Sequence, residues 1–203
     1  DHPLLALEAA ARRWPDAEAL VFPHQTARLS FRQYRDEALA LAGALAAQGL
    51  SRGDHIALLA ENRSEWAIVQ MACAALGAVL VPLNTPSRKD DLAYALQQSD
   101  ARALICSTAY RSNPYLDNVT ALRPQLPLLR HVFTFEDDYP GLIAQRQGFT
   151  PQPSAPEDTA ALLYTSGTTG FPKGALLSHR AMTTNSRGAA ARLGLRAGDR
   201  WTS

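Results

Sequence analysis

Short apolar runs alternate with longer helical stretches through most of this chain, and that alternation limits the folds it can adopt. Runs of four to six residues rich in Leu or β-branched residues are typical of strands buried on both faces of a sheet. We expect strands at residues 55–60, 78–81, 103–106, 131–135 and 161–164, and helices at residues 31–48, 64–76 and 88–98. Repeated βαβ units with right-handed crossovers predict an α/β fold, a mostly parallel sheet flanked by helices.

Local signals support the element boundaries and one internal seam. Ser30 followed by Gln33 is a capping box that starts the first long helix, and Gly49 ends it. Three prolines fall together between Thr150 and Asp158. Proline clusters mark loops, so we expect any subdomain seam near residues 150–158.

The stretch from Tyr164 to Gly174, YTSGTTGFPKG, has the composition of a phosphate-binding loop. Glycines let successive backbone N–H groups point into one concavity that binds anions. Thr and Ser hydroxyls add donors, and a threonine oxygen can also reach a phosphate-bound Mg²⁺. Lys173 adds positive charge, and Lys89 is the only other lysine in the chain.

A polar surface loop is the simpler interpretation of a segment rich in Gly, Ser, Thr and Pro. Here, however, the apolar run 160–164 leads into the loop and the apolar run 175–177 leaves it. We therefore expect two buried strands to fix the loop in place, which favours a functional role.

The spacing excludes the phosphate loop of the nucleoside triphosphatases, which requires GxxxxGK followed by Ser or Thr. Counted from Gly167, Lys173 lies at the right offset. Pro172, however, replaces the second glycine, and Gly174 replaces the hydroxyl that binds Mg²⁺. Pro172 also removes one backbone N–H from the loop.

The segment from Thr165 to Gly174 resembles the TSGTTGxPKG signature of the adenylate-forming (AMP-binding) superfamily. That superfamily includes acyl-CoA synthetases, the adenylation domains of peptide synthetases and firefly luciferase. Other stretches also resemble family segments: LSFRQY at 29–34, GDHIAL at 53–58, Asn62 with Glu65-Trp66, GAVLVPLN at 77–84 and LSHR at 177–180. The resemblance runs from about Leu29 to the end of the chain.

The resemblance implies a two-step ligase that uses ATP, Mg²⁺ and coenzyme A to activate a small carboxylic acid. A carboxylate attacks the α-phosphorus of ATP to form an acyl-adenylate, and a thiol then accepts the acyl group. The phosphate-binding residues that it implies are Thr165, Ser166, Gly167, Thr168, Thr169, Gly170 and Lys173. Thr168 is the expected magnesium contact.

The resemblance also implies that residues 1–203 form an N-terminal fragment of the AMP-binding domain. In the family, the adenine site, the acyl pocket and the C-terminal lobe with its adenylation lysine come later, which places them beyond Ser203. We expect no catalytic residue in this chain and no turnover by the isolated chain. The sequence begins with Asp1-His2-Pro3 and not with methionine, which agrees with a start inside a longer protein.

Composition and charge limit the classes of protein to which this chain can belong. The net charge of +1 predicts no nucleic-acid partner, and the longest apolar stretch is too short to span a bilayer. Cys73 and Cys106 lie among apolar neighbours, which predicts buried free thiols in a cytoplasmic protein. No metal-ligand spacing links them to the histidines, and formation of a homo-oligomer stays open.

For a few isolated residues we favour a structural or surface role over contact with a ligand or metal. His179 is expected at the start of the helix after residues 175–177, where a structural role is favoured over ligand contact. The acidic run at residues 136–138 is expected to be a solvated surface and not a Mg²⁺ site. Trp66 and Trp201 are expected to pack against apolar neighbours.

Alternative functions stay open at this point. The chain agrees with a fatty-acid-type acyl-CoA synthetase, which the likeness at residues 82–84 and 174–179 favours. It agrees also with a peptide-synthetase adenylation domain or another carboxylate ligase. A nucleotide-binding module without catalysis and a structural or partner-binding α/β domain are the remaining classes.

Overall fold

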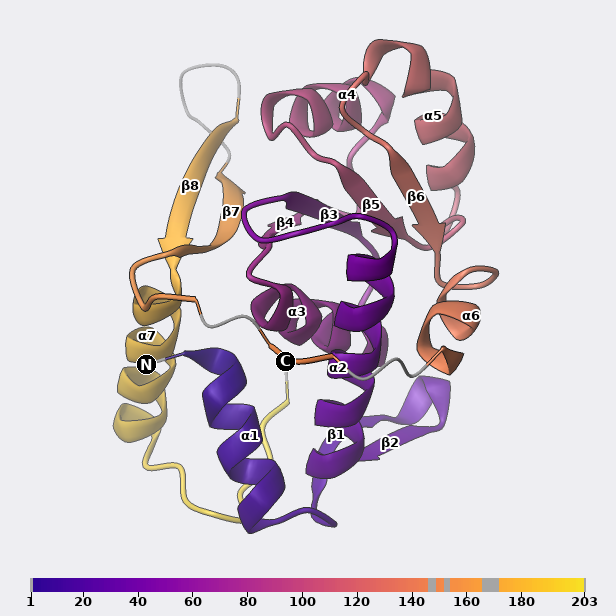
Figure 1. The fold of residues 1–203 in the computed structure, drawn as a ribbon. Helices are drawn as coiled ribbons and strands as arrows, with labels where there is room; N and C mark the ends of the chain where they lie inside the picture. Colours follow the sequence, from indigo (N-terminus) through magenta and orange to yellow (C-terminus); the bar gives the residue numbers. More distant parts are fainter. Residues whose placement is uncertain (1, 146–148, 152–153, 166–171, 203) are drawn as a thin grey trace.

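A single six-stranded sheet, in the order β6-β5-β3-β4-β7-β8, organises the computed structural model (Figure 1). The structure describes residues 2–145, 149–151, 154–165 and 172–202. The strands are β3 His55–Leu59, β4 Val79–Pro82, β5 Ala103–Cys106, β6 His131–Thr134, β7 Thr159–Thr165 and β8 Lys173–Ser178. Neighbours from β6 to β7 pair in parallel, and β8 pairs antiparallel with β7. The predicted α/β class with a mostly parallel sheet is confirmed.

Helices cover both faces of the sheet and create two apolar cores (Figure 1). Helices α2 (Phe31–Ala47), α3 (Ser64–Leu76) and α6 (Tyr139–Ala144) contribute to the first core, and α4 (Lys89–Gln98) and α5 (Tyr115–Leu122) to the second. In β3, Ile56 and Leu58 belong to the first core, whereas Ala57 and Leu59 belong to the second. This central strand is therefore buried on both faces, as its apolar sequence predicted.

The predicted cap and boundaries agree with the structure to within a residue or two. The Ser30 hydroxyl accepts a hydrogen bond from the Gln33 amide at 3.2 Å, and the Gln33 side chain accepts one from the Ser30 amide at 2.8 Å. This reciprocal pair is the predicted capping box. Gly49 follows the helix with φ of +83°, a conformation in which glycine carries no Cβ penalty.

The sequence patterns did not predict the elements at the N-terminal end. They are α1 (Pro3–Arg13) and a separate two-stranded hairpin of β1 (Glu18–Phe22) and β2 (Ala27–Ser30), which are joined by a 3₁₀ turn at Pro23–Gln25. A second 3₁₀ turn, Arg123–Gln125, follows α5. The hairpin turn includes Thr26 at φ of +54°. A left-handed threonine gives no Gly or Asn signal of the kind that marks hairpin turns.

The C-terminal elements correct two expectations. Strand β8 is mostly exposed and not buried, because it is the edge strand and Leu176 on it is 64% exposed. Trp201 is 66% exposed, so its predicted packing role is wrong, whereas Trp66 does pack against the first core. Helix α7 (His179–Leu193) starts at His179 as expected and lies beside α1 (Figure 1).

The predicted state of the cysteines is confirmed. Cys73 and Cys106 are free and buried, and burial raises the pKa of each thiol to about 12. Within the described parts of the chain, no helix combines the length and apolar character needed to cross a membrane.

Candidate functional site

The predicted phosphate loop connects β7 to β8. Thr165 is the last residue of β7 and Lys173 the first of β8, and the two are paired in the antiparallel register. The remaining predicted contacts, Ser166, Gly167, Thr168, Thr169 and Gly170, lie outside the described residues, and so does the predicted magnesium contact of Thr168.

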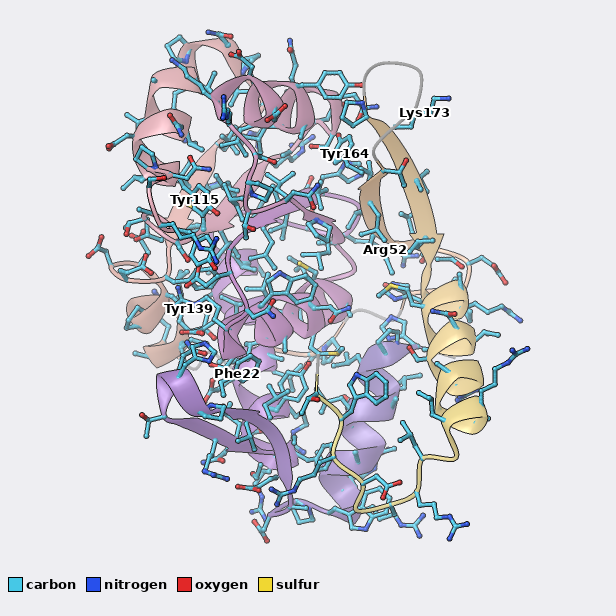
Figure 2. All side chains as sticks on the ribbon, turned by 180° about the vertical axis from the view of Figure 1, so that it is seen from behind. Phe22, Arg52, Tyr115, Tyr139, Tyr164 and Lys173 are labelled. Atoms are coloured by element: carbon cyan, nitrogen blue, oxygen red, sulfur yellow. The ribbon has the colours of Figure 1, made fainter. Side chains whose placement is uncertain are left out.

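The two described ends of the loop lie side by side. The Thr165 hydroxyl donates a hydrogen bond to the carbonyl oxygen of Lys173 at 3.3 Å. Lys173 is exposed at the start of β8 (Figure 2). Among the described residues no carboxylate lies within ion-pair distance of Lys173, so its ammonium group is available to an anion.

Gly174 has a packing role next to the loop. A Cβ added at this position would lie 3.0 Å from the Leu162 side chain, closer than real Cβ atoms normally approach a neighbour. Gly174 pairs with Tyr164 across the hairpin. The last described glycine of the motif therefore leaves room for the Leu162 side chain beside β8, and a larger residue would require that side chain to shift.

A cavity of about 250 Å³ lies beside the loop. Its lining comes from the segment after β4, from α4 and from the loop ends: Leu83, Asn84, Pro86, Ser87, Asp91, Tyr94, Ala95, Tyr164, Thr165 and Pro172. Tyr94 and Tyr164 meet edge to face across it, with 6.4 Å between ring centroids. Burial raises the pKa of Tyr164, so its hydroxyl stays a hydrogen-bond donor near neutral pH.

His179 has the structural role that the sequence favoured. Its ring is 1% exposed and stacks on His2 with 4.0 Å between ring centroids. The hydroxyl of Ser178, the residue before it, accepts a hydrogen bond from the Ala181 amide and caps α7. His2, which the sequence did not single out, closes this contact from α1; its position before Pro3 at a helix start was the available signal.

The acidic run at residues 136–138 is exposed, as the sequence predicted, and it also makes local contacts. Glu136 accepts hydrogen bonds from the Thr108 amide at 2.9 Å and from Arg63 at 3.0 Å. Arg63 also pairs with Glu65 at 3.0 Å, and hydrogen bonds from Arg63 hold the pKa of Glu65 at about 2 against the effect of burial. These carboxylates tie the ends of β3, β5 and β6 together. In the described part of the chain, no group of His, Cys, Asp or Glu is arranged to hold a metal ion.

Comparison with known proteins identifies the family. The sequence profile of the AMP-binding enzyme family matches residues 7–203. The chain belongs to the AMP-binding enzyme family. The described ends of the motif at residues 165–174, Thr165 and Lys173, are paired with each other in this member of the family.

Curated relatives of this AMP-binding chain include two acyl-CoA-forming proteins. It is 34% identical over 96% of its length to YngI of Bacillus subtilis, whose name assigns it provisionally as an acyl-CoA synthetase. It is 32% identical over 93% of its length to the mitochondrial medium-chain acyl-CoA ligase ACSF2 of Danio rerio. The matched regions are 40% and 35% of those two proteins, so the chain spans well under half of their length.

Solved structures agree with this assignment. The inhibitor-bound N-terminal domain of FACL13 from Mycobacterium tuberculosis superposes with a TM-score of 0.89 at 27% identity, over 98% of this chain and 50% of that domain. The anthranilate CoA ligase AuaEII, solved with anthranoyl-AMP, superposes with a TM-score of 0.85 at 27% identity, over 98% of this chain and 38% of that one.

Proposed function

We propose that the complete protein is an ATP-dependent, AMP-forming acid–thiol ligase, an acyl-CoA synthetase that acts on a fatty acid. The observation that carries this proposal is the β7–β8 hairpin, which brings both ends of the TSGTTGFPKG segment together and leaves Lys173 exposed beside them. The names of the relatives, a medium-chain acyl-CoA ligase among them, support the reaction class.

The proposed reaction has two steps. A carboxylate oxygen of the acid attacks the α-phosphorus of ATP, the bond to the β-phosphate breaks, and an acyl-adenylate and pyrophosphate result. The thiol of coenzyme A then loses its proton and attacks the acyl carbonyl, and AMP leaves. Negative charge builds up on the departing pyrophosphate in the first step, so a fixed cation beside it lowers the barrier.

The described residues fit a polyphosphate at this position. Lys173 offers a positive charge without a competing carboxylate among the described residues. The Thr165 hydroxyl on the facing strand donates its proton to the Lys173 carbonyl in this structure and would turn to the phosphate when one binds. We assign the β- and γ-phosphates to Lys173 and Thr165 together with Ser166, Gly167, Thr169 and Gly170. Thr168 is the proposed contact to Mg²⁺, whose chemistry is to neutralise phosphate charge.

Several wider assignments belong to the same proposal. Residues 1–203 represent the first part of the AMP-binding domain, which the superposition on half of the FACL13 N-terminal domain supports. Any subdomain seam lies at residues 150–158. A small carboxylic acid and coenzyme A are the substrates, and the two unpaired thiols favour a cytoplasmic protein.

Replacement of Lys173 tests the proposal. In the complete protein, Lys173→Ala should reduce carboxylate-dependent exchange of pyrophosphate into ATP by about 100-fold, the effect of removing one preorganised charge partner of a transition state. Lys89→Ala is the matched control, because Lys89 is the other lysine, is exposed on α4 and does not line the cavity. An unchanged exchange rate in Lys173→Ala would contradict the proposed role of the loop.

A further inference from the structure

Both ends of the phosphate loop make contact with the same helix. The Tyr94 hydroxyl on α4 donates a hydrogen bond to the carbonyl oxygen of Pro172, the residue before Lys173, at 3.0 Å. On the other side of the loop, the Tyr164 hydroxyl donates to the carbonyl oxygen of Ala95 on α4 at 3.0 Å. The Tyr164 hydroxyl also lies within hydrogen-bonding distance of the Gln98 side-chain amide. These contacts join positions 66 to 78 residues apart in the sequence.

Pro172 lies one residue past Thr165 and Lys173, the last pair of the β7–β8 ladder among the described residues. Pro172 has no N–H with which to donate a backbone hydrogen bond. Its carbonyl oxygen accepts a hydrogen bond from the side, from a tyrosine on a different element.

Helix α4 is a rigid support for this contact. Leu92, Ala95 and Leu96 are buried in the second core, and the Tyr94 and Tyr164 rings meet edge to face at 6.4 Å. A residue on a packed helix keeps its place better than a residue on an exposed edge strand. Lys173 thus takes its position relative to the rest of the molecule through Pro172 and Tyr94 as well as through β8.

From these contacts we propose that Tyr94 and Tyr164 are positioning residues, which anchor the exit and the entry of the phosphate loop to α4 and so place Lys173 for the adenylation step. The inference rests on the proposed function, since Lys173 must act on a phosphate for its placement to matter. A small displacement of a charged group from a developing charge strongly lowers its effect on the rate. The Tyr94 hydroxyl, bonded to the residue before Lys173, can therefore influence the rate without touching substrate.

The test removes only the hydroxyl. In the complete protein, Tyr94→Phe keeps the ring and its contact with Tyr164 but loses the bond to Pro172. We expect kcat/KM for ATP in the pyrophosphate exchange to fall about three- to tenfold, the usual effect of losing one neutral hydrogen bond. The KM for the carboxylic acid should stay at its wild-type value, and the melting temperature should fall no further than in the control variant described below. Tyr164→Phe should change kcat/KM for ATP in the same direction.

Tyr34→Phe is the matched control. It removes a bond of the same type, from the Tyr34 hydroxyl on α2 to the Ala67 carbonyl on α3 at 3.1 Å, away from the loop. This variant should lower stability without changing kcat/KM for ATP.

Two outcomes separate this inference from the proposed function. If Lys173→Ala slows exchange and Tyr94→Phe does not, the positioning role is wrong and the proposed function stands. If Lys173→Ala leaves exchange unchanged, the proposed function fails and the positioning role fails with it.

Discussion

At the scale of single residues, His2 and His179 combine deep burial with unmet hydrogen-bonding capacity. The two rings are stacked, and His2 Nε2 and His179 Nδ1 have no partner among the described residues. A charged imidazole is costly in such surroundings. Burial lowers the pKa of His179 to about 4, and the positive charge that His2 would carry lowers it in the same direction. Burial lowers the pKa of His2 as well, so packing of α1 on α7 favours the neutral form of both rings.

This pair predicts a loss of stability in mild acid. The unfolded chain binds a proton at His179 below pH about 6.5 and the folded chain only near pH 4. The contribution of the neutral ring is thus complete above pH about 6.5 and is lost as the pH falls toward 4, by up to about 3 kcal/mol. Urea unfolding at a series of pH values should show a shallower slope for His179→Gln in this window.

A second histidine variant serves as the control for that measurement. His24 is exposed in the turn between β1 and β2, so His24→Gln leaves the buried pair intact and should keep the wild-type slope. Equal slopes for wild type and His179→Gln would show that the ring is not the source of the pH dependence.

The site residues divide by how far they could be predicted from the sequence. Thr165 and Lys173, the proposed phosphate contacts that the structure describes, could be singled out because an unusual local composition marks them. Tyr94 was not, because its partner Pro172 is 78 residues away and one tyrosine on a helix has no local signature. Glu136 is exposed, as predicted, but its hydrogen bond with Arg63 could not be predicted, because the two residues lie 73 positions apart.

At the scale of elements, local sequence signals predicted the bounds of helices and strands but not the position of a strand in the sheet. Helix α3 and strand β5 were predicted with the correct bounds, since apolar runs that end at polar residues fix both. Strand β8 was predicted to be buried because Leu176 and Leu177 are apolar, but its edge position leaves Leu176 exposed. Which strand lies at an edge depends on sheet order, and local sequence carries little information about it.

The start of α2 yields a prediction at this scale. Ser30→Ala removes the hydroxyl that accepts from the Gln33 amide and should lower the free energy of unfolding by about 1 kcal/mol. Ser30→Asp keeps an acceptor at the cap and should retain wild-type stability. Denaturant unfolding monitored by circular dichroism measures the free energy of unfolding of both variants. A loss of the same size in Ser30→Asp would indicate that the hydroxyl acts through a contact other than the cap.

At the scale of the whole molecule, the last elements present apolar side chains to solvent. Leu176 on β8, Leu193 on α7 and Trp201 after it are 64%, 55% and 66% exposed. Of the residues of α7, only His179 is buried. Residues of this chain nevertheless form an apolar core on each face of β3, so we expect the 203-residue chain to fold.

Folding and turnover should therefore separate in the isolated chain. The chain spans 40% of YngI and 35% of the Danio rerio ligase. Among its described residues we propose Lys173 and Thr165 as phosphate contacts and assign no acyl-binding or thiol-binding group. We expect a cooperative thermal transition but no acyl-CoA thioester when the isolated chain is incubated with ATP, Mg²⁺, coenzyme A and a fatty acid. The complete protein, assayed in parallel, is the positive control. Thioester formed by the isolated chain would mean that these 203 residues contain the whole catalytic site.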